Sequence, residues 1–322
     1  MAAVLTQAYT LAKEAASERQ LFQATWGLYI TKANSRQFDD ARMLGEELLE
    51  ISRKLGDDDL QMEGLHHRWG FWYFTGQTAK MLEVCQEGVR RYDSQRHHRL
   101  SQVYAGHDPG VCAHCCTAIG LGLGGRAQDA ATSLDSALAL AESVQHPFSL
   151  AFALGNGSVA MQLAGDIEAC QNMAGREMQV AKKFDLPLQH GLGQFMFGLA
   201  RTQQGDIAAG LAMMEANHDT AVRHSFLGVY PNLVMIEALR RGGRAKEAFA
   251  LVTRTFDTLI SPEVGLHVSE LWRLRAELAL ADSAANAALA EGWLRTAVRI
   301  ASEQGATVYR ARAESALAQL VD

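Results

Sequence analysis

The stretch PFSLAFALGNGSVAMQLAGDIEACQNMAGREMQVAKKFDLP, residues 147–187, indicates the fold of this 322-residue chain. Pro147 opens an apolar helical segment, and proline suits the first helical position because its missing N–H is not needed there. Gly165 divides the stretch, and glycine readily adopts the left-handed conformation that ends many helices. A second helical segment carries the small residue Cys170, and Pro187 opens the next unit. The 40 residues from Pro147 to Leu186 predict one antiparallel helix pair.

The same features recur along the chain. The five prolines, spaced by 38, 40, 44 and 31 residues, are Pro109, Pro147, Pro187, Pro231 and Pro262. The glycines between helical segments are Gly76, Gly125, Gly165, Gly205 and Gly243. Five positions after each glycine, and at equivalent points near both ends, stand Ala41, Met81, Ala130, Cys170, Gly210, Ala248 and Ala290. These residues are mostly small, so two helices can approach closely there, and the pattern predicts a helix pair repeated about every 40 residues.

We expect seven such pairs. The first helices span roughly 18–33, 59–74, 109–123, 147–163, 187–203, 228–241 and 264–281. The second helices span roughly 37–55, 77–92, 127–144, 167–184, 207–223, 244–259 and 285–304, and single helices lie at 2–16 and 307–320. No segment alternates with period two for long, so we expect essentially no sheet. The predicted fold is all-α, a right-handed superhelix forming one helical-repeat domain over residues 1–322.

One irregular insertion interrupts the repeat near residues 93–109. The spacing from Met81 to Ala130 is 49 residues, and the extra residues fall within RRYDSQRHHRLSQVYAGHDPG, 90–110. The segment is basic and has no continuous apolar stripe, which favours a solvated loop, although contact with an acidic partner stays open.

Composition excludes several classes of protein. The net charge is −6, from 30 basic and 36 acidic residues, which argues against a nucleic-acid-binding protein. Five cysteines are too few for a disulfide scaffold. The first residues have no basic segment typical of a signal peptide. The longest uncharged run, 143–165, contains a proline and an asparagine and favours a buried helix over a membrane span. We therefore expect a cytoplasmic protein that binds neither membrane nor nucleic acid.

The repeat unit resembles the tetratricopeptide repeat, whose usual period is about 34 residues. Four stretches are similar to the C-terminal helical-repeat region of large bacterial signalling proteins: QLFQATWGLY (20–29), YAGHDPGVCAH (104–114), HPFSLAFAL (146–154) and LHVSELWRLRAELAL (266–280). Those proteins carry a domain like adenylate or guanylate cyclases and a P-loop ATPase domain ahead of the repeats. This chain has neither a cyclase-like segment nor GxxxxGK[ST], so the resemblance, which covers nearly the whole chain, implies a sensing or docking role and no catalysis.

The densest group of potential metal ligands is HDPGVCAHCC, residues 107–116. Three of its cysteines share one face of the expected helix, where they could bind zinc or act as reactive thiols. A second half of a zinc site is missing nearby, and cysteine packs well as a small apolar residue, so we favour core packing and assign no metal or cofactor. The metal or thiol interpretation stays open, and its residues would be His66, His67, His107, Cys112 and Cys115.

First helices are expected to line the concave face of the superhelix. Large or polar residues there are candidates for contact with a ligand or partner, although core packing and a surface ion pair are alternatives for some of them. The candidates are His67, Trp72, Asn156, His190, Tyr230, Glu270 and Arg273.

The predicted function is non-catalytic. We expect a monomer or homodimer that binds a protein, a peptide or a small regulatory ligand in its groove and changes curvature or order on binding. No GxSxG or HExxH motif occurs, and no catalytic residue is assigned. One alternative is a metal- or thiol-dependent enzyme on the same array, and another is a purely structural scaffold.

Overall fold

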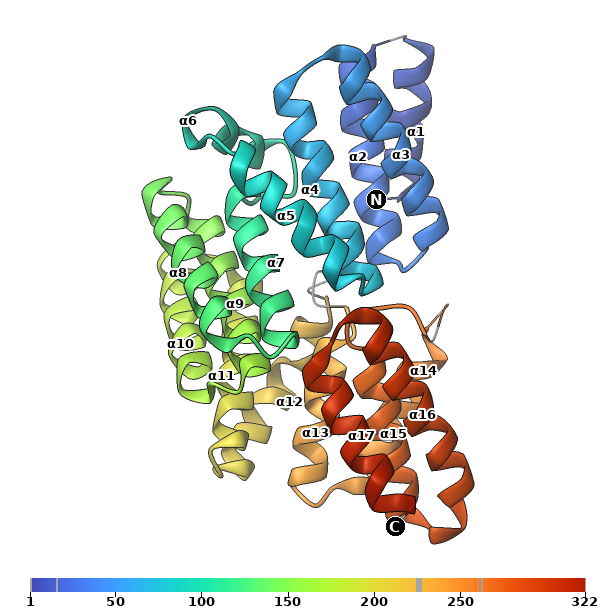
Figure 1. Cartoon of the computed structure of the whole chain (residues 1–322). Coiled ribbons are helices and arrows are strands. Elements are labelled where there is room, and N and C mark those ends of the chain that lie inside the picture. The colour runs from blue at the N-terminus through green and yellow to red at the C-terminus, as the bar shows by residue number, and fades with distance from the viewer. Residues whose placement is uncertain (1, 16, 224–227, 260, 262, 322) are drawn as a thin grey trace.

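Helices joined by short turns account for the fold (Figure 1), which a computed structural model describes for residues 2–15, 17–223, 228–259, 261 and 263–321. In chain order the α-helices are α1 (Ala2–Glu14), α2 (Glu18–Asn34), α3 (Phe38–Leu55), α4 (Asp58–Thr75), α5 (Thr78–Arg91), α6 (Ser94–His97), α7 (Pro109–Leu123), α8 (Ala127–Ser143), α9 (Pro147–Ala164), α10 (Ile167–Lys183), α11 (Pro187–Gln203), α12 (Ile207–Arg223), α13 (Tyr230–Arg241), α14 (Ala245–Asp257), α15 (Val268–Asp282), α16 (Ala287–Gln304) and α17 (Thr307–Val321). The described residues also form the 3-10 turns η1 (His98–Gln102) and η3 (Ala284–Asn286). No strand occurs in the described part of the chain, and none of its helices combines the length and apolar content needed to cross a membrane.

The predicted helix pairs are confirmed. They are α2 with α3, α4 with α5, α7 with α8, α9 with α10, α11 with α12, α13 with α14, and α15 with α16, while α1 and α17 flank the array. The expected boundaries differ from the observed ones by at most four residues, at the start of α15.

Helix ends follow the local signals in the sequence. Pro147 lies in the first turn of α9, and Asp108 caps α7 by accepting a hydrogen bond from the backbone N–H of Val111 at 3.0 Å. Gly165 ends α9 with φ of 85°, a left-handed conformation that a residue with a Cβ adopts only with strain. Local chemistry therefore defines where each helix begins and ends.

The repeated small residues lie where paired helices cross. All seven are buried: Ala41, Met81, Ala130, Cys170, Gly210, Ala248 and Ala290. At Gly210 the two helices approach so closely that an added Cβ would lie 2.6 Å from the carbonyl oxygen of Gly198 on the partner helix. The predicted role of these residues in close helix packing is thus confirmed.

The insertion is more ordered than the expected solvated loop. It contains α6 and η1, and Asp93 caps α6 by accepting from the N–H of Gln95 at 2.9 Å. Arg96 and Arg99 both donate to Asp59 at the start of α4, so the basic residues are held by acidic residues of the same chain. These long-range ion pairs have no signature in the local sequence, so the sequence left the order of this segment open.

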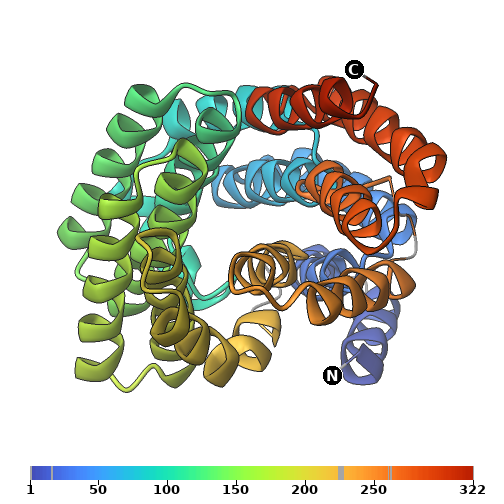
Figure 2. The same cartoon turned by 90° about the horizontal axis from the view of Figure 1, so that it is seen from below.

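The superhelix curves until its two ends meet. Figure 1 shows α1–α5 above α13–α17, joined through α7–α11, and Figure 2 shows the same curve from below. Arg36, after α2, donates to the carbonyl oxygen of Val264, 228 residues away, at 2.6 Å. Gly76, at the end of α4, lies against Gln304 at the end of α16. Contacts between distant repeats thus supplement those between neighbours.

Candidate functional site

A cavity of about 260 Å³ opens among the first helices of the C-terminal half. It lies between α9, α11, α13, α15 and α17. Its polar lining residues are Gln162, Gln203, Tyr230, Glu237, Arg240, Arg241, Glu270, Arg273, Tyr309 and Arg312.

One wall of the cavity is an ion-pair network centred on Glu270. Arg273 binds this carboxylate in a bidentate manner, with nitrogen–oxygen distances of 2.8 and 2.9 Å, and both side chains are buried. Arg312 from α17 donates to the same carboxylate at 2.9 Å, and Arg273 also reaches Glu277 at 2.5 Å. Burial lowers the pKa of Arg273, but the charges of Glu270 and Glu277 outweigh it and raise the pKa above its ordinary value. The network is charged and preorganised.

A second group of charges lies on α13. Arg240 donates twice to Glu237, at 2.9 and 2.7 Å, and Arg241 donates to Glu237 at 3.0 Å. Burial raises the pKa of Glu237, but the hydrogen bonds and charge of Arg240 lower it below its ordinary value. The lining holds four arginines and two glutamates, a net charge of +2, or +1 if the neighbouring Glu277 is included.

Two tyrosines at the cavity connect helices that are far apart in sequence. Tyr230 donates its hydroxyl hydrogen to Gln162 Oε1 on α9 at 2.9 Å. The hydroxyl of Tyr309 hydrogen-bonds with Nδ1 of His267 at 2.8 Å. Burial lowers the pKa of His267 to about 3, so this imidazole is neutral at physiological pH. Hydrogen bonds between buried, uncharged side chains therefore connect the helices around the cavity.

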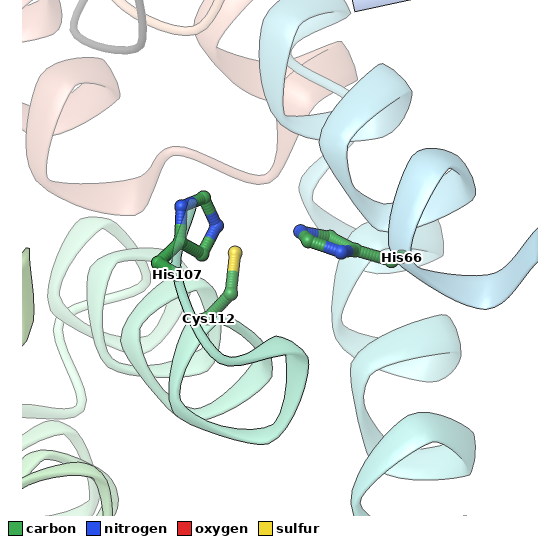
Figure 3. A group of neighbouring side chains, drawn as sticks. All are labelled: His66, His107 and Cys112. Atoms are coloured by element: carbon green, nitrogen blue, oxygen red, sulfur yellow. The ribbon is translucent and has the colours of Figure 1, made fainter. Parts of the chain in front are cut away.

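A separate cluster lies in the N-terminal half, where α4 packs against the start of α7. Figure 3 shows the rings of His66 and His107 on either side of the Cys112 sulfur. One ligand atom from each of these three residues lies within 4.8 Å of the others, and all three side chains are buried. His67 turns instead toward Gly45 and Tyr29, and Cys115 lies outside the cluster.

Neighbouring side chains orient the cluster. His66 Nδ1 lies 3.0 Å from a carboxylate oxygen of buried Glu63, and Trp69 donates its indole N–H to Cys112 Sγ at 3.4 Å. The His107 ring stacks on Phe152 with 3.9 Å between ring centroids. Each ring therefore has a fixed orientation.

The protonation states in this cluster are shifted. Burial lowers the pKa of His66, but the charge of Glu63 and the neighbouring Cys112 outweigh it and raise that pKa to about 10. Burial raises the pKa of the Cys112 thiol, while Cys116 and the two imidazoles hold it well below its usual range. This arrangement favours a thiolate beside an imidazolium.

Comparison with known proteins gives a relative of unknown function. No family model matches this chain. An uncharacterized protein of Rhizobium meliloti (strain 1021) is 24% identical over 306 residues, which cover 94% of this chain. The chain spans only 29% of the length of that relative.

Solved structures identify the fold. A Rap protein complexed with competence and sporulation factor matches 94% of this chain and 76% of its own, with a TM-score of 0.53 and 14% identity. A tetratricopeptide repeat protein from Parabacteroides merdae matches 92% of this chain and 99% of its own, with a TM-score of 0.48 and 12% identity. A signal transduction ATPase from Pyrococcus horikoshii with a tetratricopeptide repeat sensor matches 92% of this chain and 49% of its own length, with a TM-score of 0.42 and 11% identity. This chain has a tetratricopeptide-like fold.

Three of the seven groove candidates line the cavity of this tetratricopeptide-like array: Tyr230, Glu270 and Arg273. Their signal in the sequence was a large or polar side chain on a first helix.

The other four candidates lie elsewhere. His67 and Asn156 are buried in helix packing, and Asn156 donates to the backbone oxygen of Phe152 on its own helix. Trp72 is half-buried beneath the ammonium group of Lys80, and His190 is half-buried on α11. None of these four contacts the cavity.

Sequence reasoning missed Glu237, Arg240 and Arg312 as cavity residues. Arg312 stands on the last helix, α17, outside the first helices from which the groove candidates were chosen. No local pattern distinguishes an arginine facing the cavity from one facing solvent, because both are polar positions on an amphipathic helix.

Proposed function

We propose that this chain is a non-catalytic docking module that binds a protein partner or peptide through a carboxylate received in the C-terminal cavity. The observation that carries the proposal is the net positive charge of the cavity lining. Arginine side chains present several N–H donors in a planar arrangement that matches a carboxylate.

The cavity retains capacity for a further anion. Arg312 uses one terminal nitrogen for Glu270, and its side chain is 46% exposed, so the rest of the guanidinium group faces solvent. Arg241 uses only Nε for Glu237, and its side chain is 44% exposed. An incoming carboxylate could therefore bind Arg241 or Arg312 without breaking the network beneath them.

Structural similarity supports a partner-binding role. Tetratricopeptide-like arrays offer extended concave surfaces for binding. The Rap protein that shares this fold is complexed with competence and sporulation factor. We infer that a partner of this chain enters on the concave side of its array and that the carboxylate of the partner is held by α13 and α17.

The proposed module regulates a larger assembly. The relative from Rhizobium meliloti is more than three times as long as the matching region, which fits a repeat array that controls other domains. In this proposal an occupied cavity links α13 to α17 and limits their relative movement, which would alter the order of the array.

The burial of the candidate catalytic side chains argues against the enzyme alternative. It would use the region of His66, His67, His107, Cys112 and Cys115, whose exposed fractions are 5%, 4%, 7%, 0% and 1%. A substrate could not reach these groups without local unfolding of the packed helices.

A library of short random peptides, with free or amidated C-termini, tests the proposal. We expect selected peptides to carry a free C-terminal or side-chain carboxylate, and Arg312→Gln to weaken their binding by about tenfold. Arg310→Gln is the matched control, because Arg310 lies on the same helix, is equally exposed and does not line the cavity. Selected peptides that bind Arg312→Gln as tightly as the unchanged protein would contradict the proposal, as would a library that yields no binder.

A further inference from the structure

The cluster around Cys112 has the donor set of a transition-metal site. It offers two imidazole nitrogens and one sulfur from residues that lie on α4, in the segment before α7 and on α7. Zinc takes such ligands at about 2.0–2.1 Å for nitrogen and about 2.3 Å for sulfur, while calcium and magnesium require oxygen ligands. We propose that His66, His107 and Cys112 bind a single zinc ion.

The distances are compatible with closure around an ion. Tetrahedral ligands at these bond lengths lie about 3.3–3.6 Å from one another. The three ligand atoms here lie within 4.8 Å of one another. Side-chain rotations that shorten these distances by about 1 Å or slightly more would bring all three atoms to zinc-binding distance. Three protein ligands leave one position of the tetrahedron for a water molecule.

Glu63 supplies the outer-sphere contact that zinc-binding histidines commonly have. Its carboxylate lies 3.0 Å from His66 Nδ1, so it accepts a hydrogen bond from the N–H at that position and leaves Nε2 to coordinate a metal. The other carboxylate oxygen, Oε1, is buried and has no hydrogen-bond partner in the described part of the chain. This arrangement keeps the Nδ1 proton of His66 in place when a metal takes the position of the proton on Nε2.

An unpartnered nitrogen provides independent evidence. His107 is only 7% exposed, and its buried Nε2 has no hydrogen-bond partner among the described residues. Buried polar atoms without partners are uncommon in folded proteins, and a missing ion is one explanation for them. In Figure 3 a nitrogen of this ring faces the Cys112 sulfur, as expected for a second ligand.

Charge balance favours a divalent ion. A zinc ion of charge +2, one thiolate and the Glu63 carboxylate sum to zero in a buried setting, whereas a monovalent copper ion would leave a net negative charge. Uncompensated charge is costly in a protein interior. Cys112 binds as the thiolate, and binding displaces any proton on His66 Nε2, which leaves to solvent.

The position of the site indicates its role. His107 lies at the C-terminal end of the irregular insertion, and Cys112 lies on the next helix, α7, while His66 belongs to the preceding helix pair. Zinc would therefore fix the insertion between two repeats at the point where the regular spacing is broken.

Metal titration of the purified full chain, stripped with a chelator, tests this proposal. We expect one equivalent of Zn²⁺ to bind and to raise the melting temperature. Co²⁺ in its place should give a sulfur-to-cobalt charge-transfer band and intense visible bands typical of tetrahedral coordination. A wild-type protein that binds no stoichiometric Zn²⁺, or that shows no sulfur-to-cobalt band, overturns the proposal without any variant.

Variants then assign the ligands. Cys112→Ala should abolish the charge-transfer band, while Cys115→Ala, the matched control on the same helix, should keep it. Glu63→Gln should weaken zinc binding by about 10–100-fold and keep the band. A band that survives in Cys112→Ala, or an unchanged affinity in Glu63→Gln, would show that the metal lies elsewhere.

Discussion

The Tyr230 hydroxyl on α13 donates to Gln162 Oε1 on α9 at 2.9 Å, joining helices whose residues are 68 positions apart. Tyr230 is fully buried and Gln162 nearly so. This bond fixes the distance between two helices that line the cavity.

Removing the Tyr230 hydroxyl tests this connection. Tyr230→Phe should destabilise the protein by about 1–3 kcal/mol, because Gln162 Oε1 would be left buried without a partner. The double variant Tyr230→Phe/Gln162→Leu should recover part of the loss, since neither polar group then remains. Urea denaturation measures both, and a double variant less stable than the sum of the two single changes would contradict this account.

The Arg273 ion pair is expected to dominate local stability. Arg273→Met leaves the buried Glu270 carboxylate with only Arg312, and should destabilise the protein by about 3 kcal/mol or more. Arg299→Met is the control, because Arg299 forms ion pairs with two exposed glutamates and should change stability by less than about 1 kcal/mol. Equal effects of the two changes in chemical denaturation would refute the distinction.

Glu177 on α10 is a source of instability at neutral pH. The side chain is fully buried, neither carboxylate oxygen has a hydrogen-bond partner among the described residues, and burial raises its pKa well above the ordinary value. The carboxyl group packs against α9, where a Cβ on Gly155 would lie 2.6 Å from Glu177 Oε1.

Glu177→Gln should therefore raise stability at pH 7 by about 1–3 kcal/mol. A raised pKa means that the folded state holds its proton longer than the unfolded state, so stability declines as pH rises above about 4.5. The gain from glutamine should vanish at pH 4. Exposed Glu168→Gln on the same helix is the control and should have little effect at either pH. A gain that persists at pH 4 would point to a cause other than ionisation.

His267 should make the protein sensitive to acid. Burial lowers its pKa to about 3, whereas the unfolded state titrates near 6.5. Between these values the unfolded state binds the extra proton, so stability is complete above about pH 6.5 and declines as pH falls. This single group should contribute about 2 kcal/mol of lost stability between pH 6.5 and pH 5.

His267→Asn tests this contribution, because asparagine does not titrate and can still hydrogen-bond with the Tyr309 hydroxyl. The variant should lose less stability than the unchanged protein when urea unfolding is compared at pH 7 and pH 5. Identical losses would exclude His267 as the responsible group.

The fold could be predicted because its signals are local. Pro147 and Gly165 act within a few residues of their own positions, and small residues such as Ala130 are needed wherever paired helices cross. Periodic recurrence of these signals is sufficient to identify a helical-repeat architecture.

The sites depend on information that local patterns do not contain. Almost every residue of α9 is buried, so Asn156 has no face that sequence could assign to a groove, and it lies in helix packing. The Cys112 cluster needs His66, which is 46 positions away and reaches it only through the packing of α4 on α7. The missing half of the zinc site, which sequence reasoning sought nearby, belongs to the preceding repeat.

The contact of Arg36 with Val264 changes the mechanics of the array. In an open solenoid each repeat contacts only its neighbours, so the pitch of the superhelix can change gradually. Here the Arg36–Val264 hydrogen bond and the packing of Gly76 against Gln304 join distant repeats, so a partner that widens the groove strains the whole array until these contacts break. Accommodation of a bulky partner should therefore occur in one abrupt step, with a threshold, and small ligands that fit without widening the groove should meet a stiff, preformed surface.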